Sequence, residues 1–147
     1  MYNRQQLALG TAILAGMPAR AEIPCSGAPS GKTLGPARII EVETQGGGAY
    51  GTLQYARSLD LAEKEILFTF DDGPDPVVTP QILDTLDRHC LKATFFFTGL
   101  RAERYPELVR EAWRRGHTIA THTYSHPNNL RRGAPSYARA QITRGQE

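Results

Sequence analysis

Two short polar clusters hold the residue types that could do chemistry in this chain. Asp71 and Asp72 are neighbours, and His122 and His126 are four residues apart. Adjacent carboxylates repel each other, so they persist most readily where a cation or a proton separates their roles. Two histidines at this spacing can point to one side of a single turn and bind one metal ion. Each pattern alone is weak, because Asp-Asp-Gly-Pro is ordinary turn chemistry and His-x-x-x-His is common by chance.

Taken together, the two clusters predict a metal site with hydrolytic chemistry. One carboxylate and two imidazoles give three protein ligands, which leaves a position open for water, as in catalytic rather than structural zinc sites. The second carboxylate is then available as a general base for that water. An Asp-His-His set also fits a non-haem iron site, but the spare carboxylate favours hydrolysis.

The surrounding pattern predicts the elements that position these clusters. Nearly continuous apolar runs indicate buried strands at Ile66–Phe70, Ala93–Thr98 and Thr118–Thr121. Helical spacing of apolar residues predicts helices over Val77–Cys90, Pro106–Arg115 and Ser136–Arg144, with Gly116 capping the second. Alternating strands and helices are typical of an α/β domain with a parallel sheet. The polar clusters follow the first and third strands, where such domains place functional residues.

The residues of these two clusters resemble the motifs of a known protein family. The segment Thr69–Pro74 (TFDDGP) is similar to the first motif of the NodB-homology polysaccharide deacetylases, carbohydrate esterase family 4. His122–His126 (HTYSH) is similar to their second motif, and the order, the spacing and the intervening Ala93–Phe97 strand also agree. The resemblance covers roughly residues 60–135.

The resemblance implies a role for each site residue. Asp71 would be the catalytic general base, and Asp72, His122 and His126 would hold a divalent metal, most often Zn²⁺. The reaction would be hydrolysis of N-acetyl groups on GlcNAc-containing glycans, such as chitin oligomers or peptidoglycan. The partner would therefore be an N-acetylated glycan.

The resemblance also implies a fold that is only partly present. We expect an α/β fold that forms the N-terminal half of a distorted (β/α) barrel of the glycoside hydrolase/deacetylase type, with three β/α units. The family's later motifs, which include an Arg-x-Pro-Tyr-like segment and a late Leu-x-His, do not appear. His89 and His117 are poor substitutes for the missing general acid, since neither follows a strand. We therefore expect a fragment with low or no activity alone, or a non-catalytic metal- and glycan-binding remnant.

The N-terminal segment reads as a targeting signal. Arg4, the uncharged stretch Leu7–Met17 and Ala19-Arg20-Ala21 give the three regions of a signal peptide in order; a cytoplasmic chain with an amphipathic first helix is the alternative. The predicted organisation is a signal peptide at 1–21, an extension or linker at 22–62 and a partial deacetylase domain at 63–147, with the mature chain outside the cytoplasm. In that compartment Cys25 and Cys90 either pair or stay as two thiols.

Composition excludes several other classes of protein. The chain has 147 residues, 40% of them hydrophobic and 22% charged, which indicates one globular domain. No apolar run approaches the ~20 residues that a membrane helix needs, so stable membrane insertion is not expected. The net charge of +2, without an aromatic-interleaved basic groove, gives no reason to expect nucleic-acid binding. The oligomeric state stays open.

Overall fold

The computed structural model describes residues 57–147. Residues 68–147 belong to one compact unit, and residues 57–67 belong to another. The predicted signal peptide, most of the predicted extension and Cys25 lie outside the described residues, and so does any pairing of Cys25. The boundary between residues 62 and 63 stays a prediction.

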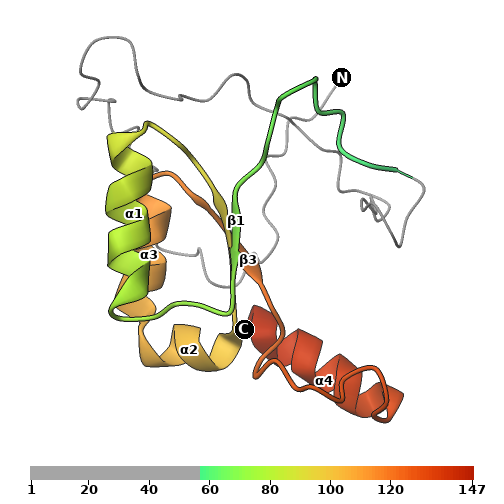
Figure 1. Cartoon of the computed structure of the whole chain (residues 1–147). Coiled ribbons are helices and arrows are strands. Elements are labelled where there is room, and N and C mark those ends of the chain that lie inside the picture. The colour runs from blue at the N-terminus through green and yellow to red at the C-terminus, as the bar shows by residue number, and fades with distance from the viewer. Residues whose placement is uncertain (1–56) are drawn as a thin grey trace, which may run out of the picture. The chain divides into compact units, whose positions relative to one another are not determined.

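Three strands and four helices follow one another within the described part of the chain (Figure 1). They are β1 (Thr69–Asp71), α1 (Val78–Arg88), β2 (Thr94–Phe97), α2 (Gly99–Arg104), α3 (Pro106–Arg114), β3 (Thr118–Thr121) and α4 (Pro135–Gln146). The prediction of an α/β fold is therefore confirmed, while the prediction that it forms the N-terminal half of a distorted barrel stays a prediction.

The strands form a parallel sheet in the order β1-β2-β3. Phe70 is in register with Phe95, and Phe95 is in register with Ile119. Helices α1 and α3 lie side by side next to the sheet (Figure 1). Because the strands are parallel, their carboxyl ends meet at one edge, and the polar residues after β1 and β3 are brought to that edge.

The core lies between the sheet and the helices α1 and α3. Phe95, which is 1% exposed, is at its centre and stacks on Phe70 with ring centroids 5.2 Å apart. The buried apolar residues of this core are Leu83, Leu86, Ala93, Phe95, Phe97, Val109 and Ala112. Aromatic residues dominate the middle strand, and their burial fixes its position between the two neighbours.

The first strand differs from its prediction. It comprises Thr69–Asp71 rather than Ile66–Phe70, and Ile66 and Leu67 are 68% and 52% exposed. Within the described residues β1 pairs on one side only, with β2. Thr69 and Asp71 are exposed and Phe70 is only partly buried, so the prediction that this strand is buried was wrong.

The remaining elements agree closely with the prediction, with one addition. Strand β3 has the predicted bounds, and α1, α3 and α4 differ from theirs by at most two residues at either end. Helix α2 was not predicted, because six residues are too few to show helical periodicity. Gly116 has φ +86° and its amide donates to the Trp113 carbonyl, which confirms its capping role.

None of the helices in residues 57–147 combines the length and the apolar character that crossing a bilayer requires.

Candidate metal centre

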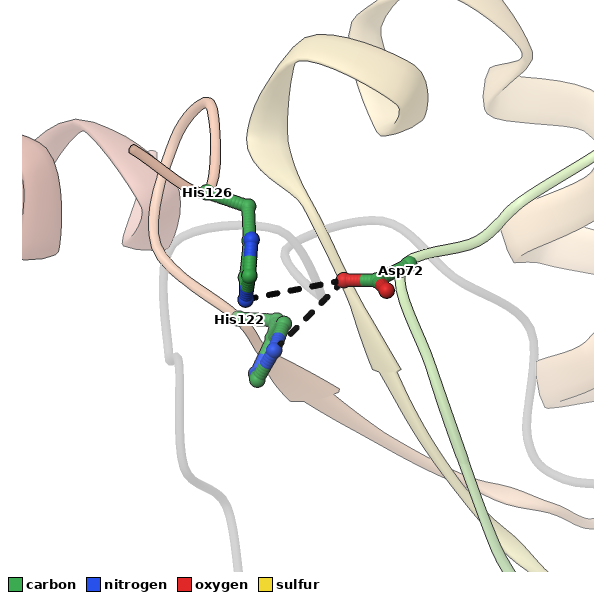
Figure 2. A group of neighbouring side chains, drawn as sticks. All are labelled: Asp72, His122 and His126. Atoms are coloured by element: carbon green, nitrogen blue, oxygen red, sulfur yellow. Dashed lines mark ion pairs between the residues drawn. The ribbon is translucent and has the colours of Figure 1, made fainter. Parts of the chain in front are cut away.

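The three side chains expected to bind metal lie together at the carboxyl edge of the sheet (Figure 2). Asp72 follows β1, His122 follows β3, and His126 is four residues further on. Their nearest ligand atoms all lie within 4.8 Å of one another. Residues 50 positions apart in the sequence are thus brought together by the parallel arrangement of β1 and β3 around β2.

The distances within this group are close to those of a metal site. Asp72 Oδ1 lies 3.6 Å from His122 Nε2 and 3.9 Å from His126 Nε2. Two ligand atoms bound to one tetrahedral zinc at 2.0–2.1 Å are about 3.4 Å apart. The two carboxylate–imidazole distances are therefore only about 0.2 and 0.5 Å longer than that spacing. One carboxylate oxygen and two imidazole nitrogens are also a donor set that suits zinc.

The site is accessible to solvent. The side chains of His122, His126 and Asp72 are 30%, 52% and 66% exposed. A structural zinc site is closed by four protein ligands, whereas a catalytic one keeps a position for water or substrate. The described arrangement has three ligands and accessible surface, so it fits the second kind.

The turn after β1 presents Asp72 in a strained conformation. Asp72 has φ +66°, a value that a residue with a side chain adopts at a cost of about 1–3 kcal/mol. The next residue is held in place, because the Thr98 amide donates to the Gly73 carbonyl at 3.0 Å. A Cβ atom on Gly73 would lie 2.9 Å from the Phe97 ring, so only glycine lets the turn approach β2 this closely.

The loop that carries the histidines is also strained and tightly held. Thr123 and His126 have φ +61° and +49°. The His122 amide donates to the Phe97 carbonyl at 2.8 Å, which extends the parallel ladder by one bond. The His126 amide donates to Thr123 Oγ1 at 3.1 Å, and the two imidazole rings stack with centroids 4.7 Å apart. This turn brings both Nε2 atoms to the Asp72 carboxylate.

Asp71, the expected general base, is the last residue of β1 and is exposed. It is in register with Phe96 of β2 and directly precedes Asp72. It is not one of the three clustered residues. The structure therefore places one aspartate of the pair in the cluster and the other beside it, and their division into base and ligand stays a proposal.

The other two histidines of the chain lie away from this edge. His117 is fully buried, its Nδ1 accepts a hydrogen bond from the Ala93 amide at 3.3 Å, and its ring packs edge-on against Phe95. Both His117 and Ala93 precede their strands, at the amino edge of the sheet. Helix α1 ends at Arg88, and His89 is the next residue.

Contacts from α2 and α4 were not found by sequence reasoning. The histidine loop accepts hydrogen bonds from the amides of Gly99 and Leu100. It donates hydrogen bonds to both oxygens of Gln141. Gln141 lies 16 residues from its partner Ser125. No local pattern signals a contact that depends on how α4 packs.

Comparison with known proteins agrees with the motifs. A family model described as polysaccharide deacetylase matches residues 58–147. A peptidoglycan-N-acetylglucosamine deacetylase from Bacillus cereus is 46% identical over 93 residues, which is 63% of this chain and 34% of that protein. A chitooligosaccharide deacetylase from Sinorhizobium fredii is 48% identical over 63 residues, which is 43% of this chain and 29% of that protein.

The fold also has solved counterparts. The peptidoglycan deacetylase PdaC from Bacillus subtilis superposes with a TM-score of 0.52 at 40% identity, covering 54% of this chain and 39% of that one. The chain thus spans about a third of the length of the curated relatives that it matches.

Proposed function

Because the chain belongs to the polysaccharide deacetylase family, we propose that it carries the metal-binding part of a deacetylase. The substrate class is a GlcNAc-containing glycan, such as peptidoglycan or chitin oligomers, which are the substrates in the names of its relatives. The observation that carries the proposal is the convergence of Asp72, His122 and His126 at one edge of the sheet.

Each residue of the site has a chemical role in this proposal. Asp72 Oδ1 and the Nε2 atoms of His122 and His126 hold a divalent ion, for which Zn²⁺ is the best candidate. Such an ion would supply Lewis-acid polarisation of the acetamide carbonyl and would lower the pKa of a bound water molecule. The Asp71 carboxylate would accept a proton from the attacking water as the water oxygen adds to the carbonyl carbon. The C–N bond then breaks, and acetate and a free sugar amine are the products.

One role in the reaction has no further histidine at this edge among residues 57–147. The leaving amine needs a proton, and histidine is the side chain that most often supplies one near neutral pH. His117 is buried at the amino edge, and His89 lies beyond the end of α1. We therefore expect metal binding by this chain, with low or no turnover when it is alone. The same observation favours the second candidate, a non-catalytic module that binds metal and glycan.

The proposed substrate also bears on where the chain works. Peptidoglycan and secreted glycans lie outside the cytoplasm, so the proposal includes an extracytoplasmic location after removal of residues 1–21. N-terminal sequencing of the chain recovered from a secretion host would test this point. A mature terminus near Glu22 is expected, and an intact Met1 retained in the cytoplasm would contradict it.

Calorimetric titration with Zn²⁺, followed by an acetate-release assay on chitin oligomers, tests the proposed function. Binding of one zinc ion per chain is expected. Absence of zinc binding would overturn the metal site. Zinc binding with glycan binding and no acetate release would favour the non-catalytic module, and acetate release that EDTA abolishes would favour the enzyme.

A further inference from the structure

Helix α4 contacts the histidine loop through one narrow face. Ala138, Gln141 and Gly145 lie three and four residues apart and are the residues of α4 that are not exposed. Residues at this spacing share one side of a helix. That side is directed at the loop residues Thr123–Ser125, as the contacts below show. The rest of α4 is exposed, so its contact with the loop is not part of an extended apolar core.

Gln141 makes contacts with the loop through both its backbone and its side chain. Its backbone carbonyl accepts a hydrogen bond from the Tyr124 amide at 2.9 Å. Its Oε1 accepts one from the Ser125 amide at 3.0 Å and lies 3.2 Å from the Ser125 hydroxyl, a second donor. Two successive amides between the paired histidines are therefore satisfied by a single residue of α4.

The same loop is also held by α2. The Gly99 amide donates to the Thr123 carbonyl at 3.0 Å, and the Leu100 amide donates to the Tyr124 carbonyl at 2.8 Å. These are amides of the first turn of α2, which lack partners within their own helix. With the His126 amide bonded to Thr123 Oγ1, the amides of residues 124–126 all have partners.

A polar cluster at the end of α4 adds a third connection. The Arg144 guanidinium carbon lies 3.6 Å from the centre of the Tyr124 ring, and Nη2 of the same side chain donates to the Tyr124 hydroxyl at 2.6 Å. That hydroxyl donates to Glu103 Oε2 of α2 at 2.9 Å. Tyr124 stands between the two histidines in the sequence, so α2 and α4 both reach the residue in the middle of the loop.

We infer that Gln141 is a positioning residue of the metal centre, which acts through the backbone of Ser125 on the adjacent His126. The inference rests on the proposed function, because it assigns Gln141 to the metal site. A loop with φ +61° at Thr123 and +49° at His126 keeps that shape only while its surroundings hold it. Gln141 is not one of the three proposed ligands, and its side chain accepts the hydrogen bond of the Ser125 amide, which directly precedes His126.

The loss of this support should weaken metal binding. Replacing partners that orient metal ligands costs about 10–100-fold in metal affinity. Gln141→Met removes the Oε1 acceptor while keeping the length of the side chain, and Gln141→Glu restores an acceptor oxygen. Arg139→Met is the matched control, because Arg139 is an exposed residue of the same helix.

Titration of the full chain and its variants with Co²⁺, followed by the visible absorption of the bound ion, tests the inference. We expect Gln141→Met to weaken binding at least about tenfold and to change the absorption, with Gln141→Glu and Arg139→Met close to the parent. Equal affinity in Gln141→Met and the parent, or equal losses in Gln141→Met and Gln141→Glu, would overturn the inference. A parent that binds no Co²⁺ would overturn the proposed metal site itself, and the inference with it.

Amide hydrogen exchange of the metal-free parent gives a second measurement that does not depend on whether Gln141→Met folds. The Ser125 amide should exchange slowly, since Gln141 Oε1 accepts its hydrogen bond. Exchange of that amide at the rate of an unprotected peptide would overturn the inference.

Discussion

Gly145, in the last turn of α4, lies so close to Thr123 that a Cβ atom on it would be 2.7 Å from the Thr123 carbonyl carbon. The same Cβ would lie 2.9 Å from the Thr123 oxygen and 3.0 Å from the Tyr124 nitrogen. All three are backbone atoms of the histidine loop, which cannot move aside as a flexible side chain can. The end of α4 and the loop are therefore in contact only because this position has no side chain.

Gly145→Ala should therefore destabilise the protein, although alanine is the better helix former. In an unobstructed helix the change would stabilise by about 0.5–1 kcal/mol. Here, overpacking against backbone should lower the free energy of unfolding by about 1–3 kcal/mol. Urea denaturation measures the difference.

Gly133→Ala is the control for this change. Its Cβ would meet the ring of Tyr137 at 3.0 Å, and that side chain can rotate away. We expect a change within about 0.5 kcal/mol. A Gly145→Ala variant as stable as the parent would show that α4 does not lie against the loop as described.

A structural element can be predicted from the sequence when the pattern that causes it lies within its own segment. Strand β3 and the helices α1 and α3 were predicted because their apolar periodicity is contained within each segment. The grouping of Asp72, His122 and His126 was predicted for a similar reason, since these residues lie in the segments that follow β1 and β3. The bounds of β1 were missed because they depend on what lies beside that strand, which its own apolar run does not reveal.

The contacts of α2 and α4 that hold the histidine loop could not be predicted from the sequence. Gln141 is an ordinary polar residue of a helix until α4 is placed against Ser125. The first turn of α2 was missed because the six-residue helix that begins at Gly99 is too short to show an apolar periodicity. Ligands are recognisable from their chemistry, whereas the groups that hold them are defined by packing.

The ion-pair network of Arg115 should contribute to stability. Arg115, which is 22% exposed, pairs with Glu111 at 2.8 Å and with Asp84 and Asp87 of α1 at 2.7 and 3.0 Å. Burial opposes the charge, but hydrogen bonds to Asp84 and Glu111 outweigh it and raise the pKa of Arg115. Arg115→Met should lower the free energy of unfolding by about 1–2 kcal/mol, as measured by urea denaturation.

Arg114→Met is the comparison for that variant. Arg114 is 56% exposed and pairs with Glu111 of its own helix, so its loss should cost less than about 0.5 kcal/mol. Equal effects of the two substitutions would contradict a role for Arg115 in joining α3 to α1.

Asp75 should make stability depend on pH in the acid range. Its Oδ1 accepts hydrogen bonds from the amides of Val78 and Val77, both at 2.9 Å, and these bonds lower the pKa of the carboxyl below its usual 3.8. A lowered pKa in the folded state contributes stability above pH 3.8, which is lost as the pH falls through the folded value. At pH 7 the parent should therefore melt at a higher temperature than Asp75→Asn, which keeps an acceptor but no charge.

The difference in Tm between the parent and Asp75→Asn should shrink as the pH is lowered from 7 to 3. Melting curves at several pH values, at constant ionic strength, measure it. A difference that stays constant across this range would show that the charge of Asp75 does not stabilise the start of α1.

Substitutions in the two aspartates separate metal binding from catalysis. Asp72→Ala or His126→Ala removes one of the three clustered ligand side chains and should reduce zinc affinity below detection in calorimetry. Asp71→Asn should leave zinc affinity within about threefold of the parent, because Asp71 lies outside the cluster and second-sphere changes that matter cost about tenfold or more.

In any form of the chain that releases acetate, Asp71→Asn should lower the rate by about 10²–10⁴-fold, the usual contribution of a general base. The same zinc affinity in Asp72→Ala, His126→Ala, Asp71→Asn and the parent would contradict the assignment of ligands. Full acetate release by Asp71→Asn would contradict the assignment of the base alone.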